Sequence, residues 1–364
     1  MVEMTSDRLF SHYEQLHRRP EPGFSEVKTK CYIKDFLSPY PELKKISEGK
    51  MGLIYQYVGR KEEKHHYDLA FRAELDAVEM DEFYGTYYHG CGHDAHTSIQ
   101  LELITYVCRN KPKLNVLFIF QASEEKYGGA KEVCKFLKDK RISISRIYAL
   151  HVTSDLYPNF VSINKGDILA AGLTCHLKLS LKNSGHVSNH GDSAASLFSK
   201  LVLLSESLDE LDCHCRITNF STNGSHNVSP TEIKFNITFR GKSSDICKQQ
   251  HQKFLDQLNV EYQNEVIMNY PLLHNNTMLY EWVEQVFSQS KVIKTLKTPF
   301  LFSCDDFAFY GKELDVPTCY FFIGAFSQGH PIHSNEFITP KASLLRGLYV
   351  MTLLIEKENE RING

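Results

Sequence analysis

Apolar positions in the first 152 residues follow two spacings, one typical of helices and one typical of buried strands. Leu9, Phe10, Tyr13 and Leu16 recur at helical spacing, and Pro20 ends this first helix. The next segments alternate in pattern, with predicted helices at 25–37, 97–109 and 129–139 and predicted strands at 52–58, 67–75, 114–120 and 147–152. Continuous apolar strands separated by helices predict an α/β sheet that is covered on both faces.

The pattern changes after about residue 170. Alternating strands are predicted at 173–181, 215–221, 232–240 and 260–269, with helices at 192–208 and 243–258. This β-α-β-β-α-β order is that of a ferredoxin-like unit. The first pattern then resumes with a helix at 278–287, a strand at 318–323 and a final helix. We therefore expect one domain made of residues 1–169 and 271–364, into which residues 170–270 are inserted as a compact α+β domain.

Composition narrows the class of protein. A chain of 364 residues is long enough for two domains, and 42% hydrophobic with 23% charged residues is typical of a globular protein. The net charge of -3 argues against a nucleic acid or an anionic membrane as partner, because both select basic surfaces. No apolar run reaches the roughly 20 residues that span a bilayer. The ten cysteines form no Cys-x-x-Cys pair, so we expect reduced thiols and a cytoplasmic location.

The densest candidate chemistry lies between His89 and His96. This stretch of eight residues, His-Gly-Cys-Gly-His-Asp-Ala-His, holds three imidazoles, a thiol and a carboxylate, and its two glycines allow tight bends. Such donors suit zinc, manganese, cobalt or nickel. The alternative is a loop in which the cysteine is only a small buried hydrophobe.

Other polar residues follow the predicted strands. Asp76, the adjacent Glu124 and Glu125, His151 and His333 each stand at the end of a strand or in the loop after it. Singly, adjacent glutamates are typical of a helix start, and a histidine on an apolar strand is typical of a hydrogen-bonded core residue. Together they predict a site at the carboxyl edge of the sheet, where α/β proteins bind ligands. One glutamate can bind metal while the other takes a proton from water.

These motifs, in this order along nearly the whole chain, resemble a known family. It is the metal-dependent amidohydrolases related to aminoacylases and co-catalytic carboxypeptidases, in particular the group of hippurate hydrolase, indole-acetyl-amino-acid hydrolases and N-acetyldiaminopimelate deacetylase. The resemblance begins at residues 17–24, and its most specific part is His89–His96. It implies a mixed-sheet, co-catalytic metallopeptidase-like catalytic domain. It also implies that the inserted domain serves as a lid and pairs subunits into a homodimer.

The resemblance also implies roles for individual residues. Two divalent ions per subunit (Mn, Zn, Co or Ni) would be held by five ligands, Cys91, His93, Glu125, His151 and His333. Glu124 matches the general base, and Asp76 matches a carboxylate that orients a ligand. His186, Asn227 and Arg240 match residues that grip the substrate. Since Asn227 and Arg240 flank one predicted strand, we expect both to face the cleft. The chain departs from the group's pattern at several places, with Glu74 in place of an aspartate, Ser123 in place of a proline, Cys304-Asp305-Asp306 in place of Ser-Glu-Asp, and a shorter loop between Asp76 and His89.

The implied reaction is hydrolysis of the amide bond of a small N-acyl-amino acid, with N-acetyldiaminopimelate deacetylation as the leading assignment. A hippurate-like hydrolase and a dipeptidase on the same scaffold are alternatives. A metal-binding protein without catalysis is an alternative of another class, but it would not need Glu124.

Overall fold

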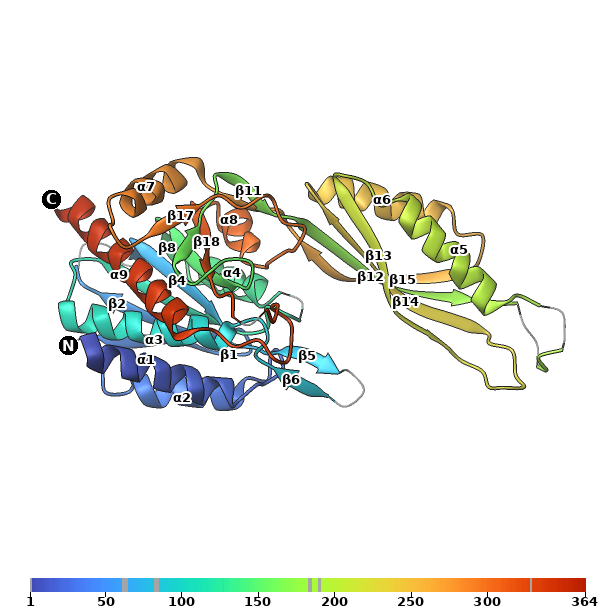
Figure 1. Ribbon diagram of the computed structural model, residues 1–364, viewed down its shortest axis with the longest axis horizontal. Coiled ribbons are helices and arrows are strands. Elements are labelled where there is room, and N and C mark those ends of the chain that lie inside the picture. The colour runs from blue at the N-terminus through green and yellow to red at the C-terminus, as the bar shows by residue number, and fades with distance from the viewer. Residues whose placement is uncertain are drawn as a thin grey trace. The chain divides into compact units, whose positions relative to one another are not determined.

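The computed structural model describes residues 2–60, 65–81, 85–126, 128–182, 185–188, 191–327 and 329–364 (Figure 1). The chain divides into two compact units. Unit 1 contains Met1–Gly166, His274–Pro299 and Phe309–Gly364, and unit 2 contains Asp167–Leu273 and Phe300–Ala308. The chain passes between the units in β11 (Gly166–Leu169), in β16 (Leu273–Asn275), and around residues 299–309, where α8 (Ala308–Leu314) begins.

Unit 1 is built on an eight-stranded mixed sheet. In spatial order its strands are β1 (Leu43–Gly49), β2 (Gly52–Val58), β7 (Asn115–Gln121), β4 (Leu69–Glu74), β9 (Ile147–Thr153), β18 (Thr318–Gly324), β10 (Phe160–Ser162) and β17 (Lys294–Leu296). The central strands β7, β4, β9 and β18 run parallel, whereas β1, β2 and β7 pair antiparallel. Every residue of these four central strands is buried, which explains their continuous apolar sequence.

Helices bury one face of this sheet in a single large core. The helices of this core are α1 (Val2–His17), α2 (Val27–Leu37), α3 (His93–Asn110), α7 (Thr277–Ser288) and α9 (Lys341–Asn363). Leu9, Ile99 and Leu344 from the helices pack with Phe71 and Phe118 from the strands. Helix α4 (Gly129–Asp139) packs against β7. The predicted α/β class with a mixed sheet is therefore confirmed.

Short strands complete unit 1. Strand β3 (His66–Tyr67) pairs with β8 (Ser143–Ile144), and β5 (Val78–Asp81) pairs with β6 (Thr86–Tyr88). No helix in the described ranges is long and apolar enough to cross a membrane. All ten cysteines lie in those ranges, and none forms a disulfide.

Unit 2 is a four-stranded antiparallel sheet with two helices. The strand order is β13 (Cys213–Thr222), β14 (Glu232–Gly241), β12 (Ala171–Ser180) and β15 (Tyr262–Tyr270). Helices α5 (Ala194–Ser207) and α6 (Ser244–Asp256) share one apolar core with the sheet, and serine side chains at positions 193 and 243 cap their first turns. The chain order of these elements is the predicted β-α-β-β-α-β order. Segment 300–308 adds to this unit through hydrogen bonds from Ala170 N to Leu301 O and Ser303 O.

Candidate metal centre

The predicted donors of unit 1 meet beyond the carboxyl ends of the central strands. Asp76 follows β4, Glu124 and Glu125 follow β7, and His151 lies within β9. Because these strands are parallel neighbours, their carboxyl ends lie at the same edge. His333 comes from the loop after β18, and Cys91 and His93 stand at the start of α3.

Gly92 turns the chain between Cys91 and His93. Its φ of 87° lies in the left-handed region, and a Cβ there would lie 2.3 Å from Cγ2 of Val152. Gly92 is the N-cap of α3, so the helix begins at His93. The sequence predicted a start near residue 97, because the polar motif hides the first helical turn. The motif is thus a turn and a helix start rather than a loop.

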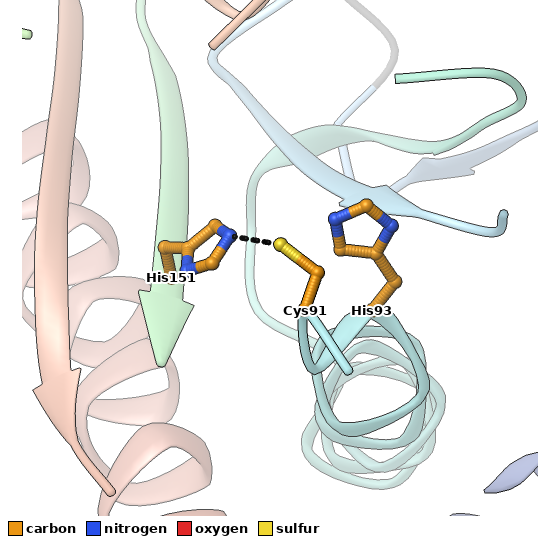
Figure 2. A group of neighbouring side chains, drawn as sticks. All are labelled: Cys91, His93 and His151. Carbon is orange, nitrogen blue, oxygen red and sulfur yellow. Dashed lines mark hydrogen bonds between the residues drawn. The ribbon is translucent and has the colours of Figure 1, made fainter. Parts of the chain in front are cut away.

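The Cys91 sulfur lies between two histidines. Its distances to Nε2 of His151 and to Nε2 of His333 are both 3.3 Å. Figure 2 shows His93 at the start of α3 and Cys91 just before it, with the Cys91 sulfur directed at His151 on β9. Cys91 is 6% exposed, so it is almost fully shielded from solvent.

Asp76 orients His93 and the two glutamates. Nδ1 of His93 donates to the Asp76 carbonyl oxygen at 2.9 Å, which leaves Nε2 of His93 facing the glutamates. That nitrogen is 3.8 Å from Glu124 Oε2 and 3.9 Å from Glu125 Oε1. The Asp76 carboxylate accepts the backbone N–H groups of Glu124 and Glu125 at 3.1 and 2.9 Å. One residue therefore fixes a histidine and both glutamates.

The donor set fits a metal centre. Sets of donor atoms within 4.8 Å of one another include Cys91–His93–His151, Cys91–Glu125–His333 and His93–Glu124–Glu125. Nε2 of His93 and Oε1 of Glu125 are buried, and neither has a hydrogen-bond partner among the residues that the structure describes. Buried polar atoms are rarely left without a partner, so these two atoms fit the role of metal ligands. Thiolate, imidazole and carboxylate together suit zinc and its neighbours.

The electrostatics of the pocket agree with this conclusion. Burial raises the pKa of the Cys91 thiol well above its usual value, and the charges of Glu125 and Glu124 raise it further. Burial disfavours the charged form of His93, but hydrogen bonding to Asp76 and the charge of Glu74 outweigh it and raise the pKa of His93 to about 10. Burial lowers the pKa of His151 well below its usual value, so this imidazole is neutral. The negative charges thus favour a cation here.

A second buried network supports the strand that carries His151. Nδ1 of His96 donates to Glu74 at 2.8 Å, and Nε2 of His96 accepts the backbone N–H of Val152 at 3.0 Å. Burial favours a protonated Glu74, but Arg72 and His96 outweigh burial and hold the pKa of Glu74 well below its usual value. His96 was not among the predicted site residues, although its place in the His89–His96 motif was a signal.

The predicted substrate residues lie in unit 2 and do not form one group there. Val187 N donates to Asn227 O at 3.1 Å, so the exposed loops that carry His186 and Asn227 are neighbours. Arg240 pairs with Gly172 at the far end of β14, where its Nη1 is 3.6 Å from the Met268 sulfur. The eight steps along the strand from Glu232 to Arg240 span about 27 Å at about 3.4 Å per step. Asn227 and Arg240 therefore lie toward opposite ends of β14 in one chain, and their roles toward a substrate remain predictions.

Comparisons with known proteins agree with this geometry. The model of peptidase family M20/M25/M40 matches residues 70–357. The chain is 26% identical to N-acetyldiaminopimelate deacetylase of Bacillus subtilis, over 96% of this chain and 98% of that protein. Among solved structures, a dinuclear metal-binding peptidase of family M20 from B. subtilis has a TM-score of 0.76 at 20% identity, covering 99% of both chains. The aminobenzoyl-glutamate utilization protein of Klebsiella pneumoniae has a TM-score of 0.75 at 14% identity, covering 97% of both chains.

The likeness to the solved structures concerns the fold. The family match over residues 70–357 contains every donor residue described above. The predicted enzyme class, a metal-dependent amidohydrolase, is confirmed at this level. Together, the match over residues 70–357 and the donor cluster within it place the chain in peptidase family M20/M25/M40.

Proposed function

We propose that this protein hydrolyses the amide bond of an N-acyl-amino acid with two divalent metal ions bound in unit 1. The observation that carries the proposal is the pair of unpartnered buried donors, His93 Nε2 and Glu125 Oε1, among further soft and hard donors. Cys91, His151 and His333 would complete the ligand set. Mn, Zn, Co and Ni all accept these donors.

Glu124 is the proposed general base. Bound divalent ions would supply Lewis acidity, which makes a water acidic and polarises a carbonyl. Glu124 is 8% exposed, and its backbone is fixed by Asp76, so its carboxylate can take a proton from the attacking water and later give it to the leaving amine. A metal-binding protein without catalysis would have no use for this second carboxylate, which favours the enzyme over that alternative.

The acyl group is proposed from the relatives. The 26% identical bacillus protein is named N-acetyldiaminopimelate deacetylase and spans the same length as this chain. N-acetyldiaminopimelate is therefore the leading substrate, and hippurate-like N-acyl-amino acids and dipeptides are the alternatives. The fold is compatible with all three.

Unit 2 is the proposed lid and dimerisation domain. Arg240 offers a guanidinium for the substrate carboxylate, and His186 offers an imidazole for the carbonyl. About 27 Å of strand separates Arg240 from the loops of His186 and Asn227, which is longer than a small N-acyl-amino acid. One chain therefore cannot offer both ends of unit 2 to one substrate. This favours a homodimer in which His186 acts in the site of the partner subunit.

A substrate screen tests the proposal. N-acetyl-, N-benzoyl- and dipeptide substrates are each incubated with protein loaded with Zn²⁺, Mn²⁺ or Co²⁺, and the free amino acid is measured. We expect turnover that chelation abolishes and that the Glu124→Gln protein lacks. Metal binding without turnover of any of these substrates would instead support the non-catalytic alternative.

A further inference from the structure

Two buried carboxylates hold three consecutive backbone amides of the glutamate loop. The N–H of Glu124 and the N–H of Glu125 donate to the two oxygens of Asp76. The preceding N–H, that of Ser123, donates to Oε1 of Glu26 at 2.9 Å. Glu26 and Asp76 are both 0% exposed. Two carboxylates therefore fix the loop, and of these only Asp76 is a predicted site residue.

The same Glu26 oxygen joins two unfavourable backbone conformations. Ser123 has a φ of 56° and Phe24 has a φ of 64°, and both lie in the left-handed region that disfavours side chains with a Cβ. The N–H of Phe24 also donates to Oε1 of Glu26, at 3.0 Å. A proline, with φ fixed near −65°, cannot take the conformation of Ser123. Such conformations persist only where surrounding contacts enforce them, and Glu26 supplies a contact to each.

Close packing reinforces this connection. A Cβ on Gly23 would lie 2.5 Å from Oγ and 3.1 Å from Cα of Ser123, so the segment before α2 presses directly on the glutamate loop. On its other side, Ser123 Oγ donates to the Lys126 carbonyl at 2.6 Å. Ser123 is thus confined by contacts on both sides.

Helix capping does not explain Glu26. Glu26 is the N-cap of α2, yet its side chain makes no capping hydrogen bond to that helix. Glu21 does this instead, and accepts from Lys28 N at 2.9 Å and Thr29 N at 2.8 Å. Oε2 of Glu26 has no hydrogen-bond partner in the described part of the chain, and its nearest cation is Lys30 Nζ at 3.8 Å. Burying a carboxylate costs free energy, and helix capping does not offset this cost for Glu26, so its contacts with the glutamate loop must account for its position.

We propose that Glu26 is a positioning residue that sets the loop carrying the general base Glu124 and the metal ligand Glu125. The proposal rests on the function proposed above for these two residues. Glu26 is in none of the donor groups that could hold a metal ion among the described residues, and it acts through the N–H of Ser123. Without it, the loop would lose one of its anchors directly before the base, and errors of about 1 Å in such groups cost up to about 100-fold in rate.

The test compares three variants of the metal-loaded protein. Glu26→Ala removes the acceptor, Glu26→Gln keeps an acceptor oxygen, and Glu21→Ala removes the other buried carboxylate of the same segment. For Glu26→Ala we expect kcat to fall about 10- to 100-fold at a KM within about twofold. Glu26→Gln should retain most of the wild-type kcat. Glu21→Ala should lower the midpoint of thermal unfolding but leave kcat close to the wild-type value.

Hydrogen exchange of the Ser123 amide gives a second measurement that needs no substrate. It should become faster in Glu26→Ala and remain slow in Glu21→Ala. The proposal is overturned if Glu26→Ala keeps both its kcat and its slow exchange, or if Glu21→Ala loses as much kcat as Glu26→Ala. If the unchanged protein hydrolyses no N-acyl-amino acid, the proposed function fails, and the exchange rates alone decide whether Glu26 holds the loop.

Discussion

At the residue scale, the two adjacent glutamates lie in different surroundings, so substitution of each should have a different effect on metal binding and on kcat. Oε1 of Glu125 is 3.5 Å from His333 Nε2 and lacks a hydrogen-bond partner among the described residues, as a metal ligand would. We predict that Glu125→Gln loses bound metal together with activity. Glu124→Gln should keep its metal and lose about 10²–10⁴ in kcat, because only the base is removed. Metal analysis of both proteins beside steady-state kinetics checks this, and equal metal content with equal residual activity would contradict the assignment.

Glu26 should also make stability depend on pH. Burial and, to a smaller extent, the charge of the nearby Asp76 carboxylate together raise the pKa of Glu26 from 4.5 to about 7. The folded protein then holds this proton more tightly than the unfolded chain, so stability falls as pH rises from about 4.5 to 7. The Gln side chain of Glu26→Gln does not titrate. The free energy of unfolding of this variant, relative to that of the wild-type protein, should therefore rise by about 2–3 kcal/mol over that pH window. Unfolding in denaturant at pH 5 and pH 8, with chelator throughout, measures this, and a constant difference would contradict the prediction.

The donor residues could be predicted from sequence because their types are informative. Cys91 and His93 stand in a motif that few structural roles require, and Glu124 and Glu125 follow an apolar strand. The part played by Glu26 could not be predicted, since its partner Ser123 is 97 residues away and contributes only a backbone N–H. A backbone donor leaves no mark on the sequence.

At the scale of elements, α1 and α3 are joined by an ion pair with a buried carboxylate and a partly exposed arginine, and this pair can be tested separately from catalysis. Arg8 donates from Nη2 to Glu102 Oε2 at 2.7 Å, and His12 Nε2 is 3.2 Å from Oε1. The Glu102 side chain is fully buried. We predict that Arg8→Ala destabilises the fold by about 2–3 kcal/mol, because it leaves a buried carboxylate with one partner fewer.

A second substitution provides the control for this pair. Glu102→Gln in the Arg8→Ala background should recover part of the stability, because a neutral amide costs less to bury than a carboxylate. Chemical unfolding of the single and double variants measures the recovery. If the double variant is less stable than Arg8→Ala, the charge on Glu102 is not the source of the loss.

The elements that the sequence missed are those whose polarity reflects an edge or a turn. Strand β1 contains Lys44, Lys45 and Glu48, and its residues are half-buried or exposed because it lies at the edge of the sheet. Helix α3 begins four residues earlier than expected, because its first turn consists of the polar motif itself. By contrast, the buried strands β7, β9 and β18 were found within about one residue of their observed bounds. Their continuous apolar sequences have no competing interpretation at that length.

At the scale of the whole molecule, the chain order of unit 2 was predictable and its reach was not. The alternating strands and amphipathic helices indicated its topology, since each has one apolar face. The separation of Arg240 from Asn227 follows from the length and register of β14, in which Arg240 pairs with Gly172 and Glu232 pairs with Ser180. Two residues that flank the same strand in the sequence need not lie close together, because the length of the strand separates them.

This separation leads to a prediction about subunits. If His186 acts in the site of the partner subunit, Glu124→Gln and His186→Ala proteins are each inactive alone but complement each other in mixed dimers. One site of each mixed dimer then has an intact base from one chain and an intact His186 from the other. Random exchange makes half of the dimers mixed, so about a quarter of the original activity should return. Glu124→Gln mixed with Glu125→Gln is the matched control and should stay inactive, because both changes lie in unit 1. Subunit exchange is followed by mass spectrometry of differently tagged chains, and exchange without any return of activity would mean that each site is completed by its own chain.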